Sequence, residues 1–317
     1  MTDLFRAARW FALSLVFAFS GTLCAQTLRI GTLPAADSVV LDVAVEEGLF
    51  KKEGLDVATV PFKSALEVGA AMRAGRIDGH FGDLMNVFVQ NETGAPQAVV
   101  LTTTHTTSAQ RAFALVVSPK FSDRITGLDK LAATSTAMSA STIIDYLLDR
   151  MTGTEKLPAS ALKKTEVRQI PIRLQMLVSG QIETALLPEP LVSVVEQKGG
   201  RVIWDDRGLN EALAVVALKK TVLTDDVVRA FRRAVAAAAK RIEDNPEKYR
   251  ALMVQKRLLP KPAASSYKMV RFSLFGTADG LPPLPKAEEV ERVGAWMLER
   301  GMIKAQPSYE AVVWGRP

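Results

Sequence analysis

The stretch from residue 65 to residue 86 constrains the fold more than any other part of the sequence. Small and apolar residues recur at helical spacing between residues 65 and 72 and predict an amphipathic helix. Gly75 follows where a helix needs a residue of positive φ in order to end. We expect a short buried strand from Ile77 to Phe81, after which Asp83 turns the chain out of the sheet. In an open α/β sheet such a turn faces the ligand crevice, so this unit predicts an α/β fold with a binding loop at Asp83.

A similar unit recurs later in the chain. The segment Leu177–Glu183 repeats the pattern of Arg73–Asp78, and Pro188-Glu189-Pro190 then takes the place of the turn. A second match, between residues 38–42 and 141–145, has nearly the same spacing. Two matches in the same order indicate two similar α/β lobes rather than one long sheet, although motifs this short also recur by chance.

The N-terminal segment differs from the rest of the chain. It combines Arg6 and Arg9 with an uncharged apolar core from Trp10 to Phe19 and smaller residues up to Ala25. This order is typical of a secretory signal peptide, so we expect residues 1–25 to be removed and the mature protein to be periplasmic. A lipoprotein signal at Cys24 and an uncleaved membrane anchor are the alternatives.

Composition limits the chemistry of the mature chain. Cys24 is the only cysteine, so a mature chain without it has no disulfide and no thiol nucleophile. With two histidines in the sequence we expect no metal site, and no cofactor motif is present. The net charge of +6 is compatible with nucleic-acid binding, but an exported address argues against that partner. The 317 residues are enough for two domains of ordinary size.

Residue patterning predicts alternating strands and helices in both halves of the chain. Strands are expected at 27–31, 58–62, 77–81, 97–102, 112–117, 132–138, 167–170, 201–204 and 212–218. The last of these strands should cross back from the second half to the first. A long helix from Asp225 to Glu243 has acidic residues in its first turn and basic residues in its last turn, as the helix dipole favours.

Five stretches spread over the chain carry a family likeness. They are Leu28–Gly31, Glu47–Val57, Gly75–Asp78, Gly180–Pro190 and Trp296–Ile303. Together they resemble the solute-binding proteins of ABC importers of the nitrate, sulfonate and taurine type. The resemblance implies the two-lobe, type II periplasmic binding protein fold, in which each lobe is a mostly parallel sheet flanked by helices and two strands cross between the lobes.

The resemblance also implies a division of the chain and a set of partners. Lobe one would comprise residues 27–114 with 213–317, and lobe two would comprise residues 115–212. A small solute would bind in the cleft between the lobes and pass to an ABC permease and its ATPase. We expect the protein to be a monomer.

The loops at the carboxyl ends of the strands supply the candidate binding residues. A helix N-terminus with serine or threonine offers free N–H donors to a polar or anionic group, although each such residue can also serve only as a helix cap. Asp83 and Glu189 occupy equivalent positions in the two lobes, and they either bind a ligand N–H or cap the next helix and bridge the lobes. Lys63 is the candidate partner of a full negative charge, and His105 is a candidate donor. The full set of candidates is Thr32, Ser38, Lys63, Ser64, Asp83, Asn86, Thr104, His105, Ser139, Ser141, Thr142 and Glu189.

These observations favour a non-enzymatic receptor for a small polar or anionic organic solute, such as a sulfonate, taurine, nitrate or a heteroaromatic compound. No motif for hydrolysis or phosphate binding occurs in the sequence. No arginine lies in a predicted cleft loop, which argues against a doubly charged anion. One alternative is an enzyme of menaquinone or thiamine-pyrimidine synthesis on the same fold, which would need no signal peptide. A sensory receptor is another alternative.

Overall fold

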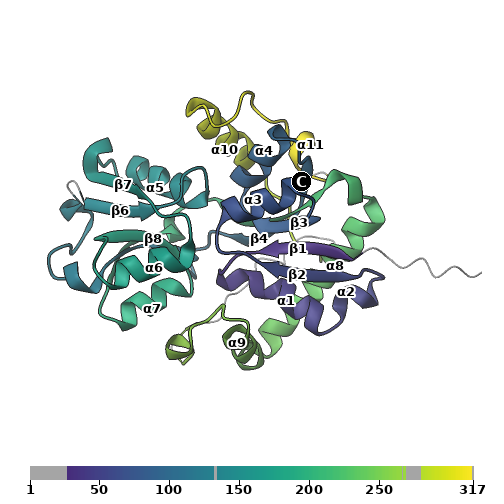
Figure 1. Cartoon of the computed structure of the whole chain (residues 1–317), viewed down its shortest axis with the longest axis horizontal. Helices are drawn as coiled ribbons and strands as arrows, with labels where there is room; N and C mark the ends of the chain where they lie inside the picture. The colour runs from purple at the N-terminus through teal and green to yellow at the C-terminus, as the bar shows by residue number, and fades with distance from the viewer. Residues whose placement is uncertain (1–26, 132–133, 266, 269–279, 316–317) are drawn as a thin grey trace, which may run out of the picture.

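The computed structural model describes residues 27–131, 134–265, 267–268 and 280–315, which form two lobes side by side (Figure 1). The strands are β1 (Leu28–Thr32), β2 (Val57–Pro61), β3 (Gly79–Gly82), β4 (Gln97–His105), β5 (Phe113–Val117), β6 (Thr134–Met138), β7 (Leu162–Glu166), β8 (Thr184–Pro188), β9 (Arg201–Asp205) and β10 (Ala212–Lys219). The helices are α1 (Val39–Glu46), α2 (Leu49–Lys52), α3 (Ala65–Arg73), α4 (Leu84–Glu92), α5 (Ile143–Thr154), α6 (Ile170–Val178), α7 (Leu191–Gln197), α8 (Asp225–Asp244), α9 (Pro246–Gln255), α10 (Ala287–Glu299) and α11 (Tyr309–Val312). Short 3₁₀ helices span Ala36–Ser38, Pro119–Phe121, Leu128–Lys130, Ala159–Ala161, Asp206–Gly208, Lys220–Val222 and Lys261–Ala263.

The two lobes contain sheets of the same topology. The strand order is β2-β1-β3-β10-β4 in lobe one and β7-β6-β8-β5-β9 in lobe two. In each sheet one strand, β10 or β5, runs antiparallel to both of its neighbours, and the other paired strands are parallel. The predicted α/β fold class, with two lobes of mostly parallel sheet flanked by helices, is therefore confirmed.

The internal recurrence seen in the sequence corresponds to equivalent elements of the two lobes. Gly75 and Gly180 have φ angles of 68° and 73°, and each ends the helix that precedes the third strand of its sheet. The match between residues 38–42 and 141–145 falls at the starts of α1 and α5, which follow β1 and β6. Asp83 and Glu189 directly follow β3 and β8, so they do occupy equivalent positions.

Apolar side chains bury both faces of the lobe-one sheet. Along β10, alternate residues belong to two different hydrophobic clusters, because successive side chains of a strand point to opposite faces. One cluster joins the sheet to α1, α2, α8 and α9, and the other joins it to α4, α10 and α11. The second cluster continues into lobe two through the apolar residues of α5, so the lobes share a buried contact.

The chain passes between the lobes twice, at residues 106–112 and at residues 206–211. These two connections touch, since the Thr106 N–H donates to the Glu211 carbonyl at 2.9 Å. Phe113 and Ala114, assigned to lobe one by the prediction, pair within the second sheet, and Ala212 already pairs with His105 in the first sheet.

One predicted strand is wrong. Residues 167–170 were expected to be extended, but the strand β7 lies just before them and Ile170 already begins α6. Pro171 is in the first turn of that helix, where its missing N–H costs nothing. The strand β7 escaped detection because it carries exposed lysines, Lys163 and Lys164, in place of an apolar pattern.

The predicted signal peptide, residues 1–25, lies outside the described residues. None of the helices that the structure describes combines the length and the apolar character needed to cross a membrane.

Candidate functional site

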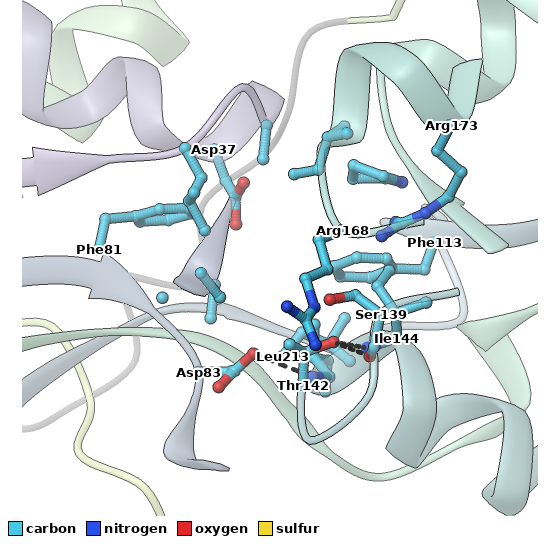
Figure 2. Close-up of a pocket in the computed structure, with 18 residues that line it drawn as sticks. Asp37, Phe81, Asp83, Phe113, Ser139, Thr142, Ile144, Arg168, Arg173 and Leu213 are labelled. Atoms are coloured by element: carbon cyan, nitrogen blue, oxygen red, sulfur yellow. Dashed lines mark hydrogen bonds between the residues drawn. The ribbon is translucent and has the colours of Figure 1, made fainter. Parts of the chain in front are cut away.

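A cavity lies between the two lobes, where the carboxyl ends of the parallel strands meet (Figure 2). It encloses about 560 Å³ of space, part of it open to solvent. Small-molecule sites occur preferentially at interfaces between domains, which is where this cavity lies. The lining residues are Leu33, Ala35, Asp37, Ala65, Phe81, Gly82, Asp83, Leu213 and Ala214 of lobe one with Phe113, Ser139, Thr142, Ile143, Ile144, Arg168, Ile170, Arg173 and Pro188 of lobe two.

Most of this lining is apolar. Figure 2 shows Phe81 and Phe113 on opposite sides of the cavity, one from each lobe. Ile143, Ile144 and Ile170 add aliphatic surface from lobe two. The few polar groups among them are therefore the ones that would orient a bound molecule.

Arg173, the fourth residue of α6, carries the one fully buried positive charge in the cavity wall among the described residues. Its Nε and Nη2 atoms donate to the carbonyl of Val167 at 3.1 and 2.8 Å, and its Nη1 atom has no partner within the described part of the chain. Burial lowers the pKa of Arg173 to about 10, so the guanidinium remains charged at neutral pH. The expectation that no arginine faces the cleft was wrong, because the loop after β7 and the first turn of α6 also line the cavity and were not counted among the cleft segments.

Asp37 faces the cavity from lobe one (Figure 2). It lies in the 3₁₀ turn after β1, and its Oδ2 atom accepts a hydrogen bond from the Thr104 hydroxyl. Burial raises the pKa of Asp37 to about 6. Asp37 was not among the predicted site residues, although the loop after the first strand was expected to supply binding residues. Thr104, a predicted site residue, acts here as its hydrogen-bond donor.

Asp83 also lines the cavity, but both of its carboxylate oxygens have protein partners. The Oδ1 atom accepts from the Asn86 N–H at 2.8 Å and so caps α4. The Oδ2 atom accepts from the Ile143 N–H of lobe two at 2.9 Å, which is drawn as a dashed line in Figure 2. Burial raises the pKa of this carboxyl. These contacts correspond to the cap-and-bridge alternative, in which the carboxylate closes the cleft.

Glu189 makes a related set of contacts. Its Oε2 atom accepts from the N–H and hydroxyl of Ser193 at 3.2 and 2.9 Å, and its Oε1 atom accepts from Arg111 at 2.7 Å. Its main-chain carbonyl accepts from the Ala36 N–H of lobe one at 2.9 Å. Together with Thr104 and His105 it lines a smaller hollow beside the main cavity.

The other candidates fall into three groups. Ser139 and Thr142 line the main cavity, and together with Asn86 and Ser141 they also line an adjoining outer hollow. Thr32 and Ser38 are buried within lobe one, and Ser64 caps α3 by accepting from the Glu67 N–H. Lys63 is exposed and His105 binds Glu289 at 2.6 Å, so neither side chain lines the main cavity.

Two arginines stand at the outer hollow. Arg168 lines both this hollow and the main cavity, and its side chain is 58% exposed and paired with Glu166. Arg73 lines the outer hollow only and donates to Gln90 at 3.2 Å. The positive charge at this outer hollow is therefore exposed, whereas the charge of Arg173 is buried.

The described residues contain no group of three or more histidine, cysteine, aspartate or glutamate side chains that could hold a metal ion.

Comparisons with known proteins agree with this geometry. Among solved structures, the chain is similar to the alkanesulfonate-binding protein SsuA from Xanthomonas axonopodis pv. citri bound to MOPS, with 17% identity and a TM-score of 0.75 over 91% of this chain and 98% of that one. It is similar to the aliphatic sulphonate-binding SsuA from Escherichia coli, with 18% identity and a TM-score of 0.73 over 91% and 97%. It is also similar to the nitrate-binding NrtA from Synechocystis PCC 6803, with 13% identity and a TM-score of 0.64 over 78% and 72%.

These likenesses confirm the resemblance to periplasmic solute-binding proteins at the level of the fold. A comparison with curated protein sequences finds no match. The model of the NMT1-like family matches residues 23–255, which is more than half of the chain. The protein therefore belongs to the NMT1-like family.

Proposed function

We propose that this protein is the solute-binding component of an ABC importer. The observation that carries this proposal is the cavity lined by residues of both lobes. A solute that contacts both lobes stabilises the closed arrangement relative to the open one, which is what a receptor needs in order to report that it is loaded. The similar solved structures named for sulfonate and nitrate binding support the same role.

Hydrogen bonds across the cleft support a closing motion. Besides the contacts of Asp83 and Glu189, the Ile170 N–H donates to the Lys63 carbonyl at 3.1 Å, and Gln169 donates to Glu67 at 2.9 Å. All of these join loops or the first turns of helices in one lobe to those in the other. The connections at 106–112 and 206–211 are the segments about which the lobes would rotate.

The solute would be a small polar or anionic organic molecule. A bare inorganic anion needs several donors to replace its water, because an unpaired buried charge is costly. The lining of this cavity is mostly apolar, which favours an organic solute with an apolar part and a few polar groups. The protein would act in the periplasm as a monomer and would pass its solute to a membrane permease driven by an ATPase.

Isothermal titration against a panel of sulfonates, carboxylates, nitrate and heteroaromatic compounds tests the proposal. We expect one solute to bind per chain at micromolar affinity, about −8 kcal/mol. Small-angle scattering should show a more compact particle with the solute than without it. The variant Phe113→Ala should weaken binding, and Phe121→Ala, a phenylalanine of lobe two outside the cavity, should not.

Recovery of the solute separates a receptor from an enzyme. After incubation, mass spectrometry should return the bound compound unchanged. Conversion to a product, or no binding across the whole panel, would contradict the proposal.

A further inference from the structure

We propose that the solute is amphoteric, with an acidic group that binds Arg173 of lobe two and an N–H donor that binds Asp37 of lobe one. This inference rests on the proposed function and names the chemical class of the molecule that fills the same cavity.

The state of Arg173 indicates an acidic partner. Two of its three guanidinium nitrogens donate to a single carbonyl, that of Val167, and Nη1 is buried without an acceptor. An unpaired buried donor costs about 1–3 kcal/mol, and more when it is charged. No described carboxylate forms a salt bridge with this guanidinium. The charge of Glu166 acts on it, but Glu166 pairs with Arg168, so an acidic solute would supply the direct counter-charge. A carboxylate or sulfonate presents oxygens at the spacing that the planar guanidinium prefers.

The state of Asp37 indicates a donor at the other end. Its side chain is 8% exposed, and the Thr104 hydroxyl donates to one of its two oxygens. A carboxylate has about four acceptor positions, so it can accept further hydrogen bonds. Arg173 and Asp37 point into the cavity from opposite lobes (Figure 2). A solute that reaches both of them therefore bridges the cleft.

The surface between these two groups is apolar. Phe81 lies beside Asp37, and Phe113 lies beside Arg173 (Figure 2). The body of the solute would contact these rings, as aromatic and aliphatic groups do in small-molecule sites.

The other charged groups of the cavity are less suited to bind the solute. Both oxygens of Asp83 accept main-chain N–H groups, one of them from the opposite lobe. Arg168 is more than half exposed and already pairs with Glu166, so its charge is largely balanced by solvent and by that carboxylate. Arg173 and Asp37 are assigned to the solute because both are buried, and because Arg173 has an unused donor and Asp37 has unused acceptor positions.

Two matched probe series test the class of solute. The aromatic series is 4-(aminomethyl)benzoate, 4-methylbenzoate, 4-methylbenzylamine and 4-methylbenzyl alcohol. The aliphatic series is taurine, ethanesulfonate, ethylamine and ethanol. In at least one series the amphoteric member should bind at least about ten-fold more tightly than either singly charged member, by isothermal titration.

Variants assign each end of the solute. Arg173→Gln should weaken the acid-bearing probes about ten-fold or more and leave the amine unchanged. Asp37→Asn should weaken the amine-bearing probes and leave the probe that carries only an acid unchanged. Arg201→Gln is the matched control, because Arg201 also donates to a main-chain carbonyl in lobe two but lies outside the cavity. Arg201→Gln should change neither affinity.

Two further measurements do not depend on whether Arg173→Gln folds. Arg173→Lys keeps the positive charge and should retain part of the preference for the acid. Binding of amine-bearing probes to the unaltered protein should also weaken as the pH falls below 6, because Asp37 becomes protonated.

The possible outcomes separate this inference from the proposed function. If a solute without an acidic group binds best, or if Arg173→Gln folds and binds the acids as before, the amphoteric class is wrong and the receptor function stands. If no solute in any panel binds, both are wrong.

Discussion

The two lobes share one topology, yet they hold each other through different atoms. Lobe one offers the Asp83 carboxylate to the Ile143 N–H at the start of α5. Lobe two offers the main-chain carbonyl of Glu189 to the Ala36 N–H in the turn before α1. The residue after β3 thus accepts a hydrogen bond from the start of α5, which follows β6, and the residue after β8 accepts one from the turn that follows β1.

This difference shows that equivalent positions can carry unequal roles. The bonds from Asn86 and Ile143 together need two side-chain acceptor oxygens at position 83, whereas the bond from Ala36 needs only the main-chain carbonyl at position 189. Substitutions at the two positions should therefore separate closure of the cleft from stability of the individual lobes.

The largest effect is expected from Asp83→Ala. It leaves the Asn86 and Ile143 N–H groups unpaired, at about 1–3 kcal/mol each. Thermal unfolding should show the loss of the α4 cap, and small-angle scattering should show a more open particle. Asp83→Asn isolates the bridge, because the single side-chain oxygen of asparagine can still cap α4, and its NH2 group, which would then face the Ile143 N–H, cannot accept a hydrogen bond. A closed Asp83→Ala variant would mean that the carboxylate does not hold the lobes together.

The next effect concerns Asp37, since the corresponding loop of lobe two, residues 139–142, has no acid. The raised pKa of Asp37 means that the folded state binds the proton more tightly, so this carboxyl lowers stability as the pH rises from about 4 to 6. Asp37→Asn should stabilise the protein above pH 6 by at most about 3 kcal/mol and leave it unchanged near pH 3. Equal gains at both pH values, by urea unfolding, would contradict this account.

A smaller effect is expected from Glu189→Ala. The substitution removes the carboxylate that accepts from the Ser193 N–H in the first turn of α7, which should lower the free energy of unfolding by about 1 kcal/mol. Arg111 keeps its bond to Glu196. Because the main-chain bond from Ala36 remains, the scattering profile should match that of the unaltered protein. An open profile would show that the side chain itself links the lobes.

The smallest effect is expected at the ends of the outer strands, where β4 ends in His105 and β9 ends in Asp205. Hydrogen bonding to Glu289 raises the pKa of His105, so the pair adds stability below about pH 6.5 that is lost as the pH rises through the raised pKa. His105→Gln should remove this dependence, which is under about 1 kcal/mol for a partly exposed pair. Unfolding midpoints between pH 5 and pH 9 measure it, and the pair of Asp205 with Arg207 should not contribute there.

Sequence patterns predicted the paired architecture because it rests on short-range rules. The positive φ angles of Gly75 and Gly180 and the turns at Asp83 and Glu189 are local features, and they recur in both lobes. Helix ends and buried strands follow from the same local chemistry.

The site residues were harder to find, because their roles depend on contacts between distant segments. Arg173 lies in the first turns of α6, and nothing in that segment alone shows that it lines a cavity shared with the other lobe. Asp37 acquires its role from the Thr104 hydroxyl on another strand. Asp83 was recognised as a candidate, but its partner Ile143 belongs to the opposite lobe. A pattern in one segment carries no information about which face of another segment it meets.

The contact between the two interlobe connections, at Thr106 and Glu211, has a consequence for how the lobes are arranged along the chain. All strands of lobe two lie on one continuous stretch, whereas lobe one is assembled from the two flanking pieces. Lobe two is thus a cassette inserted into a hairpin between β4 and β10. Excision of residues 107–210 and rejoining of the cut ends by a tight turn should leave a miniature protein that folds by itself, with half of a binding cleft and nothing to close upon.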